Sequence, residues 1–257
     1  MTPKPSSPPA SFPPSQALTL RTALTDRDRR VQRATLATRW LRWLLPLFMA
    51  LEACLAIAYL WHIAQGHPIA WIDFNARQTL PSWLQASHIL ALAAVCGWRL
   101  LRNESSTPSR LVLRLLVLVL SFAAADEIFK IHLMSHMEVI RHAFFGVYFG
   151  AIVTLPVLFW RDLRAVWRLD RGSILLAAGG LGVFCLGVFA SEWIRDVAIA
   201  PLWPLLTDRA GGVEYMRIAI EELGELWGET CFLLAALRFE WVTSEGSGRS
   251  GRNRYDR

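Results

Sequence analysis

The stretch that decides the fold is EYMRIAIEELGELWGETCFLLAALR, residues 214–238, close to the C-terminus. It has the length and apolar content of a transmembrane helix, yet its interior contains four carboxylates. A charge at the centre of a bilayer costs at least ~2.5 to 3.5 kcal/mol, so such residues indicate a functional site or a buried pair. At about 100° per residue, the four fall within an arc of ~100° on one helix face. They are Glu221, Glu222, Glu225 and Glu229.

Membrane-length apolar runs recur along the chain, which has 257 residues, is 54% hydrophobic and contains 12 Trp. Long runs without a 3.6-residue stripe are typical of a multi-pass membrane protein rather than of a soluble core. The sequence therefore predicts an all-α, polytopic membrane bundle of six transmembrane helices. The predicted spans are residues 41–64, 82–101, 111–133, 140–160, 173–193 and 215–238.

The basic residues predict the orientation of this bundle. Of the 27 Lys and Arg residues, 21 lie in residues 1–42, 99–114, 161–171 and 238–257, on one side of the predicted spans. Since positive residues collect in cytoplasmic loops, both termini are expected in the cytoplasm. The net charge of +6 then reflects topology, and no aromatic–basic pattern points to nucleic acid. The preference for Arg over Lys suits a bacterial genome, which places the protein in a bacterial inner membrane.

Outside the six-helix domain, residues 41–240, the chain is expected to form two basic tails. Residues 1–40 begin with a segment rich in Pro and Ser that should be disordered. Residues 18–39 alternate apolar and basic positions, so they form either a helix on the anionic inner leaflet or a simple basic flank. Residues 241–257 are rich in Gly, Ser and Arg and should also be disordered.

Several predicted helices bring ionisable residues to one depth. With a rise of ~1.5 Å per residue, Glu221 and Glu222 lie roughly 10 Å below the outer surface. Asp126 and Glu127 on the third span, and His88 on the second, reach about the same level, while Glu52 lies near mid-membrane on the first. The sequence therefore predicts a polar layer that is open to the outer side.

Some of these acids have a simpler interpretation. Arg217 lies one turn before Glu221, and Lys130 lies one turn after Asp126, so both acids are candidates for ion pairs within a helix. This interpretation does not cover the last helix as a whole, where one Arg faces four acids.

Two histidines follow the third span at a spacing that places both on one helix face. His132 and His136 are four residues apart, a spacing used by helical metal sites. In a continuous helix, however, His132 points about 120° away from the nearer of the two preceding acids. It joins the acidic layer only if the helix breaks near Lys130.

Glycines on the last two predicted helices indicate close packing between them. Gly224 and Gly228 form a small-xxx-small pair beside the acid stripe. Their expected partners on the fifth span are Gly179, Gly180, Gly182 and Gly187.

Three short stretches resemble a family of uncharacterised bacterial multi-pass membrane proteins. They are FNARQTLPSWLQAS (residues 74–87), ADEIFKIH (125–132) and IEELGELW (220–227). The resemblance implies where the site lies, at an acidic pair followed by His and at a paired-Glu helix, but no activity. In the relatives the His lies closer to the acidic pair than His132 does here.

The first of three hypotheses is a metal-dependent enzyme embedded in the membrane that acts on a lipid-like substrate. Carboxylate-rich helical bundles favour iron or manganese, and zinc would need more His. Glu222 and Glu225 would be catalytic, with a spare carboxylate as general base. The metal ligands would be Asp126, Glu127, His132, Glu221 and His88.

Two alternatives stay open beside the enzyme. The acids extend along the membrane normal from Glu221 to Glu229, with Glu52 nearby, as a proton- or cation-coupled transporter or channel requires. A structural membrane subunit, with its acids bonded inside the bundle or to a partner, is the third hypothesis.

Overall fold

The structure, a computed structural model, describes residues 14–67, 69–74, 76–102, 107–131, 156–199 and 212–244, and the single residues 146, 150 and 154. All regular secondary structure in this part of the chain is helical, which confirms the all-α prediction there. Most of the fourth predicted span, residues 140–160, lies outside the described residues, and so do His132 and His136.

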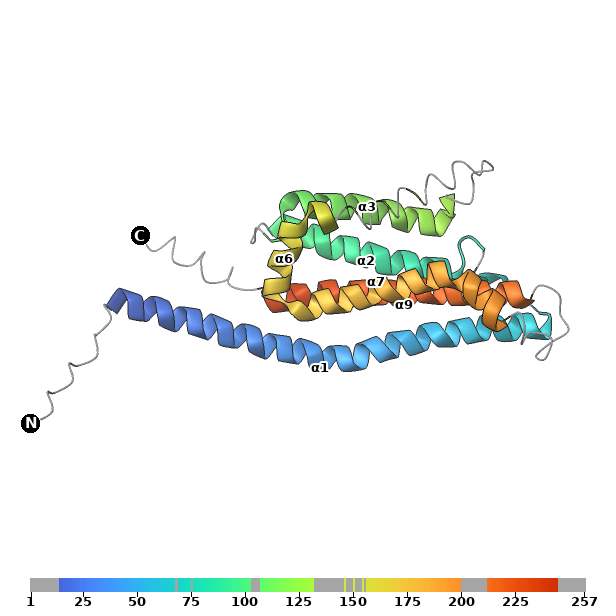
Figure 1. Cartoon of the computed structure of the whole chain (residues 1–257), viewed down its shortest axis with the longest axis horizontal. Coiled ribbons are helices and arrows are strands. Elements are labelled where there is room, and N and C mark those ends of the chain that lie inside the picture. The colour runs from blue at the N-terminus through green and yellow to red at the C-terminus, as the bar shows by residue number, and fades with distance from the viewer. Residues whose placement is uncertain are drawn as a thin grey trace, which may run out of the picture.

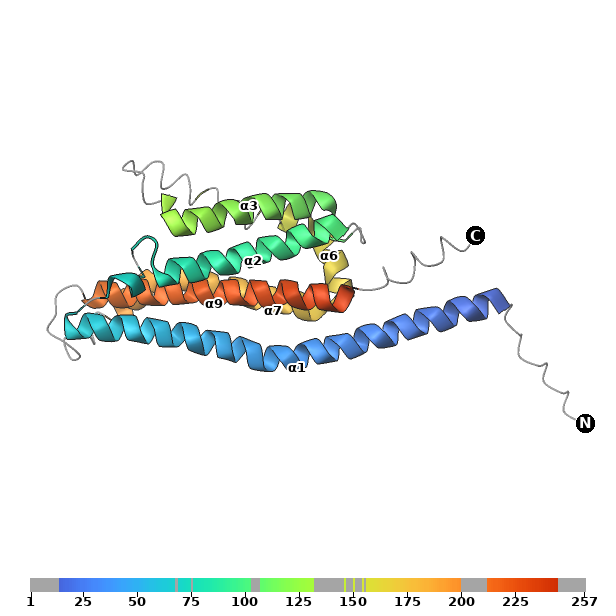
Figure 2. The ribbon, with the colours of Figure 1, turned by 180° about the vertical axis from the view of Figure 1, so that it is seen from behind.

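The first helix, α1, runs without interruption over Pro14–Gln65 and has 52 residues. At ~1.5 Å per residue this is about 78 Å, far more than a bilayer requires. Its first part extends beyond the other helices (Figures 1 and 2). Pro46 lies inside α1, whose ribbon bends in its middle region, and a proline removes one backbone hydrogen bond of a helix. Residues 14–40 and the first predicted span therefore belong to one helix.

The other helices form a bundle around α9, which packs against α1, α2 and α7 (Figure 1). The helices α2 and α3 form an antiparallel pair, and α6 crosses one end of the bundle. We call the end where α2 and α9 begin the outer end, and the opposite end the inner end, after the predicted topology. The bounds are Ala70–Ile72 for η1, Leu80–Arg102 for α2, Arg110–Phe129 for α3, Trp160–Leu169 for α6, Arg171–Ile194 for α7, Arg195–Ile199 for η2 and Gly212–Thr243 for α9.

Glycines bring α7 and α9 into backbone contact, as the sequence predicts. A Cβ atom built on Gly224 would lie 2.6 Å from the Cα of Gly187. A Cβ on Gly228 would lie 2.8 Å from the Cβ of Phe184 and 3.0 Å from the carbonyl oxygen of Gly180. Neither distance leaves room for a side chain, so only glycine permits this packing. Gly179 and Gly182, by contrast, have no such neighbour among the described residues.

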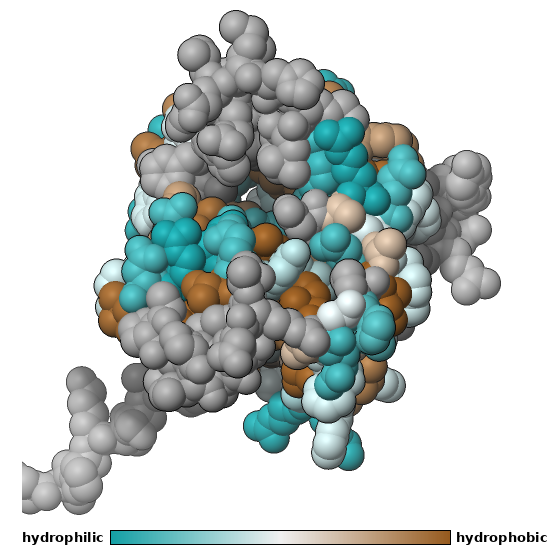
Figure 3. Space-filling model, turned by 90° about the vertical axis from the view of Figure 1, so that its right-hand side faces the viewer, coloured by the Kyte–Doolittle hydropathy of each residue, from teal (hydrophilic) through white to brown (hydrophobic). Residues whose placement is uncertain are grey.

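The outward faces of the bundle carry large apolar side chains. In the described part of the chain, three helical segments are long and apolar enough to cross a membrane: Val31–Gln65, Leu80–Arg102 and Arg171–Val197. The 20 residues of α3 and the 32 residues of α9 are also long enough, but both helices contain carboxylates. At the outer end, hydrophilic and hydrophobic residues mix on the surface (Figure 3). Exposed apolar residues include Leu51, Ile57, Leu90, Leu101, Leu118, Leu175, Leu186 and Phe189.

At the inner end, arginines join α9 to its neighbours in a group that we call the arginine clasp: Arg99, Arg102, Asp170, Arg238 and Glu240. Arg99 donates a hydrogen bond of 2.6 Å to Glu240, and Arg102 lies 3.3 Å from the same carboxylate. Arg238 donates two hydrogen bonds, of 2.8 and 3.0 Å, to Asp170. Each acid of the clasp therefore faces at least one guanidinium.

Candidate functional site

Lys130 stands where α3 ends. The helix stops at Phe129, and Lys130 adopts a left-handed conformation with φ of 46°. Its backbone N–H donates to the carbonyl oxygen of Asp126, which closes the last turn. The side chain, in a residue that is only 3% exposed, donates to Glu127 and lies 3.5 Å from Oε1 of Glu222. The helix thus breaks at Lys130, where the sequence requires a break if His132 is to join the acidic layer.

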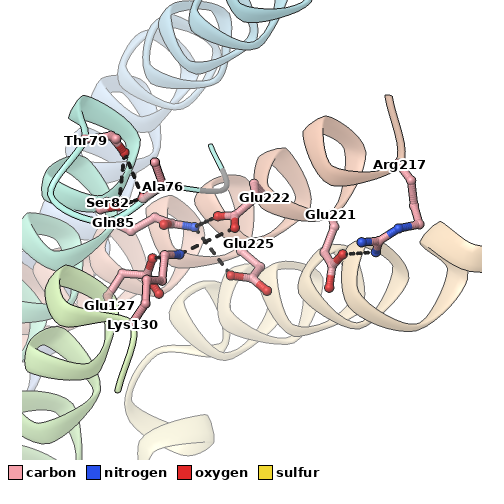
Figure 4. A network of polar contacts seen from close by, with 10 residues as sticks. All are labelled: Ala76, Thr79, Ser82, Gln85, Glu127, Lys130, Arg217, Glu221, Glu222 and Glu225. Atoms are coloured by element: carbon pink, nitrogen blue, oxygen red, sulfur yellow. Dashed lines mark hydrogen bonds and ion pairs between the residues drawn. The ribbon is translucent and has the colours of Figure 1, made fainter. Parts of the chain in front are cut away.

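Gln85 on α2 contributes a buried amide to the same place. Its Nε2 donates hydrogen bonds of 3.0 Å to Glu222 and 3.4 Å to Glu225. The residue has no exposed surface, and its Oε1 has no hydrogen-bond partner among the described residues. Together, Gln85, Glu127, Lys130, Glu222 and Glu225 form what we call the acid–lysine site (Figure 4).

The start of α2 is fixed next to this site. The hydroxyl groups of Thr79 and Ser82 lie 3.2 Å apart, and each donates to the carbonyl oxygen of Ala76 (Figure 4). Both residues are buried. This local network holds the first turn of α2, so Gln85, one turn further on, has a defined position.

Glu221 points away from the acid–lysine site and toward the outer end. Arg217, one turn earlier on α9, donates to it (Figure 4). The same guanidinium donates a 2.9 Å hydrogen bond to Glu214. The ion pair within the helix that the sequence suggested for Glu221 is therefore present. For the other suggested pair, the structure shows a contact of Lys130 with Glu127, the residue after Asp126.

A second polar group lies between α1, α2 and α9. Thr230 donates a 2.6 Å hydrogen bond to Oε1 of Glu52, and Nε2 of His88 lies 3.9 Å from the same oxygen. Glu52 is 1% exposed and His88 5% exposed. Oε2 of Glu52, Nδ1 of His88 and Oε2 of Glu229 are buried without a hydrogen-bond partner in the described part of the chain. His88 thus lies beside Glu52 and not in the acid–lysine site.

The predicted site residues fall into five sets. Glu127, Glu222 and Glu225 belong to the acid–lysine site, Glu221 directly precedes Glu222 but pairs with Arg217, and His88 lies beside Glu52. Asp126 is buried at the end of α3, and His132 lies outside the described residues. Among the described residues, no group of three or more His, Cys, Asp and Glu side chains is arranged to hold a metal ion.

Two members of the acid–lysine site were not among the predicted site residues. The sequence suggests Lys130 only as the partner of an ion pair and as the place where the helix would have to break, and it does not single out Gln85. A signal for Gln85 was present, because it is an amide inside the apolar run of α2. Without the spatial arrangement, an amide in such a run cannot be told from a residue that bonds within its own helix.

A protein-family model matches residues 42–239, which include every helix of the bundle except the first part of α1 and the end of α9. Its description is "Domain of unknown function (DUF8692)". The chain belongs to this family. The match agrees with the sequence-based expectation of an uncharacterised family, and it includes the whole acid–lysine site. A search of curated proteins and a search of solved structures each found no match to this DUF8692 protein.

Proposed function

We propose that this DUF8692 protein spans a bacterial inner membrane six times, with both termini in the cytoplasm. The exposed apolar faces of α1, α2 and α7 support a membrane location. The lengths of α3 and α9 support two further spans, because Asp126 and Glu127 of α3 are buried, and Glu222 and Glu225 of α9 are half-buried beside Gln85. The start of α1 and the end of α9 lie at the same end of the bundle (Figure 1), as an even number of spans requires.

We propose further that the protein is a proton- or cation-coupled transporter and that the acid–lysine site binds the coupling ion. The observation that carries this proposal is the buried ammonium of Lys130, which is shared by carboxylates from two different helices, α3 and α9. Two carboxylates contact this ammonium, and a third, that of Glu225, accepts from the amide of Gln85 beside them, so the site retains capacity for a proton or a second cation. Acids at this depth in a membrane typically belong to ion pathways.

The arrangement of the remaining acids supports the same function. Glu221 at the outer end, the acid–lysine site, and Glu229 follow one another along α9. Glu52 and His88 lie beside Thr230, the next residue after Glu229. A proton or cation that enters from the outer end therefore meets a series of half-buried and buried polar groups that leads toward mid-membrane.

Transport is tested with purified protein in sealed vesicles that contain a pH-sensitive dye. Inward gradients of Na⁺, K⁺ or Mg²⁺ are imposed, and we expect at least one of them to drive proton movement. The double variant Glu222→Gln/Glu225→Gln should lose this movement, while Glu192→Gln, which neutralises an exposed acid on α7, should retain it. Absence of cation-driven proton movement in the wild type would remove the transport proposal.

The metal-dependent enzyme remains a second candidate, because Glu127 on α3 and Glu222 on α9 contact the same ammonium. Carboxylates from neighbouring helices bind the metal ions of carboxylate-rich bundles, although the described residues, as they stand here, contain no group of three or more ligands arranged for one. Elemental analysis of the purified protein separates the two proposals. Near-stoichiometric iron, manganese or zinc that disappears in Glu221→Ala/Glu222→Ala would establish the enzyme, which would then act on a lipid-like substrate. A metal-free protein without ion flux would point to the structural subunit.

A further inference from the structure

The ammonium of Lys130 lies among carboxylates that are also suitable ligands for a free cation. Resting on the proposed transport function, we propose that Lys130 is a tethered occupant of a binding site for a small monovalent cation, of the size of ammonium, and that this cation is the transported species. In the structure the site holds Lys130. In the exchange that we propose, the lysine side chain leaves the carboxylates and the free cation takes its place.

The atoms around the Lys130 ammonium form a set of acceptors. Glu127 and Glu222 accept from Nζ, and Glu225 lies close enough to share the amide of Gln85 with Glu222. Because Nε2 of Gln85 donates to two carboxylates, the orientation of the amide is fixed, and Oε1 is its remaining polar atom.

That oxygen is the second observation that points to a ligand. Gln85 is completely buried, and its Oε1 has no hydrogen-bond partner among the described residues. A buried acceptor without a partner is uncommon, since its desolvation is not compensated. A cation with N–H donors, or a bare ion that takes oxygen ligands, would satisfy it together with the carboxylates.

The backbone at Lys130 favours an exchange in which its side chain leaves the carboxylates and binds them again. It is the residue at which α3 ends, and it has a positive φ although it is not glycine. L-residues with side chains pay a conformational cost in this region, and such cost is commonly found at functional sites. The contacts of the ammonium with Glu127 and Glu222 offset this cost. When a free cation satisfies the carboxylates instead, the turn at Lys130 loses that compensation.

The charge of the proposed ligand follows from the exchange. Lys130 carries one positive charge, so a monovalent cation that replaces it leaves the charge of the buried site unchanged. A divalent ion would change it by one unit inside a low-dielectric bundle. A small ammonium ion also offers the same N–H donors as Nζ.

The test removes the lysine side chain and supplies the ammonium from solution. Lys130→Gly is the suitable variant, because glycine adopts a positive φ without strain. We expect its unfolding temperature in detergent to fall by about 6 to 15 °C, since a buried charge partner is lost. Methylammonium chloride at neutral pH should restore at least half of this shift with a saturable concentration dependence.

Two controls make the result specific to the site. Tetramethylammonium chloride at the same ionic strength, which has no N–H donor, should restore nothing. In Lys130→Gly/Glu127→Gln, one acid is neutral, so this variant should be more stable than Lys130→Gly and its response to methylammonium at least ten-fold weaker. Equal effects of the two salts, or an undiminished response in the double variant, would overturn the cation site, as would a Lys130→Gly variant that unfolds like the wild type.

This result and the transport result are separable. Restoration by methylammonium without ion flux in vesicles would keep the cation site and remove the transporter. Flux without restoration would keep the transporter and overturn the cation site.

Discussion

The acid–lysine site and the arginine clasp both consist of ion pairs that join α9 to its neighbours, but their charges are balanced differently. In the clasp, Glu240 faces two arginines, and Asp170 receives two hydrogen bonds from Arg238. In the acid–lysine site, three carboxylates share the ammonium of Lys130 and the amide of Gln85.

The two regions show that ion pairs inside one bundle can serve either stability or function. A pair in which each acid has its own guanidinium stabilises one arrangement of the helices, because both groups are satisfied. A group with more acids than cations is costly to bury in the same bundle. We therefore attribute the clasp to structure and the acid–lysine site to function, and each of the following changes tests that division.

The largest effect is expected for Lys130→Met, which removes the cation of the acid–lysine site and keeps the length of the side chain. The acids are then left without their cation, and breaking a buried pair in this way costs about 3–5 kcal/mol. Thermal unfolding in detergent measures the loss. The matched variant Lys130→Met/Glu127→Gln should recover part of it, and a Lys130→Met protein as stable as the wild type would contradict the division.

A smaller effect is expected for Asp170→Asn in the clasp. Asn can still cap α7 but loses the charge that faces Arg238, a contact that should be worth about 1.5–3 kcal/mol. The pH dependence gives a second measurement. Burial raises the pKa of Asp170, but hydrogen bonds from Arg238 and Ser173 outweigh burial and hold the pKa below its ordinary value.

The sign of this pH effect follows from the lowered pKa. The folded protein holds the Asp170 carboxylate more strongly than the unfolded chain does, so the stabilisation is present above about pH 4 and is lost as the pH falls through the lower, folded value. The stability difference between the wild type and Asp170→Asn should therefore shrink under acid. A difference that stays constant down to the pH of unfolding would argue against the Asp170–Arg238 pair.

Glu240→Gln should cost about 1 kcal/mol, since Arg99 keeps its other partners and the clasp is partly open to solvent. Arg99 also donates a 2.9 Å hydrogen bond to Thr107 and lies over the ring of Phe239. Chemical or thermal unfolding of the variant gives the magnitude. A loss as large as that of Lys130→Met would show that the clasp and the acid–lysine site are not distinct in the way described above.

Glu225→Gln should give the smallest change in stability, and the sign of that change should be opposite to the sign for Glu240→Gln. It removes one of the surplus acids, so we expect stability to stay the same or to rise by up to ~1 kcal/mol, although ion flux should fall. The same substitution at Glu240 destabilises. If both substitutions destabilise equally, charge balance does not distinguish the two regions.

The sequence predicted the helical class, the acid stripe and the glycine contact, because these depend on periodicity within one helix. Gly180 and Gly187 face Gly224 and Gly228 as expected, while Gly179 and Gly182 do not. These four glycines lie on different faces of α7. Their depth in the membrane, which is all that the sequence predicts, does not show which of them face α9. Likewise, the sequence did not show that the basic segment before residue 41 continues into α1 or that residues 160–169 form the short helix α6.

The members of the site could be predicted only in part, because side chains from α2, α3 and α9 meet there. Depth placed His88, Glu127 and Glu222 in one layer, but rotation of each helix decided which of them touch. His88 lies on the face of α2 that meets α1, whereas Gln85 lies toward the acids. The role of Lys130 depended on the end of α3, where the sequence contains no Gly or Pro to mark it.

The glycine contact between α7 and α9 also limits how the protein can move. Two helices whose backbones touch along several turns slide or tilt relative to each other only by losing that contact, so α7 and α9 should act as one rigid body. Gln85 and Lys130 belong to the other body, the α2–α3 hairpin, while Glu222 and Glu225 belong to α9. Any rocking of one body against the other would therefore open and close the acid–lysine site itself, with the inner-end arginines between α2 and α9 serving as the pivot.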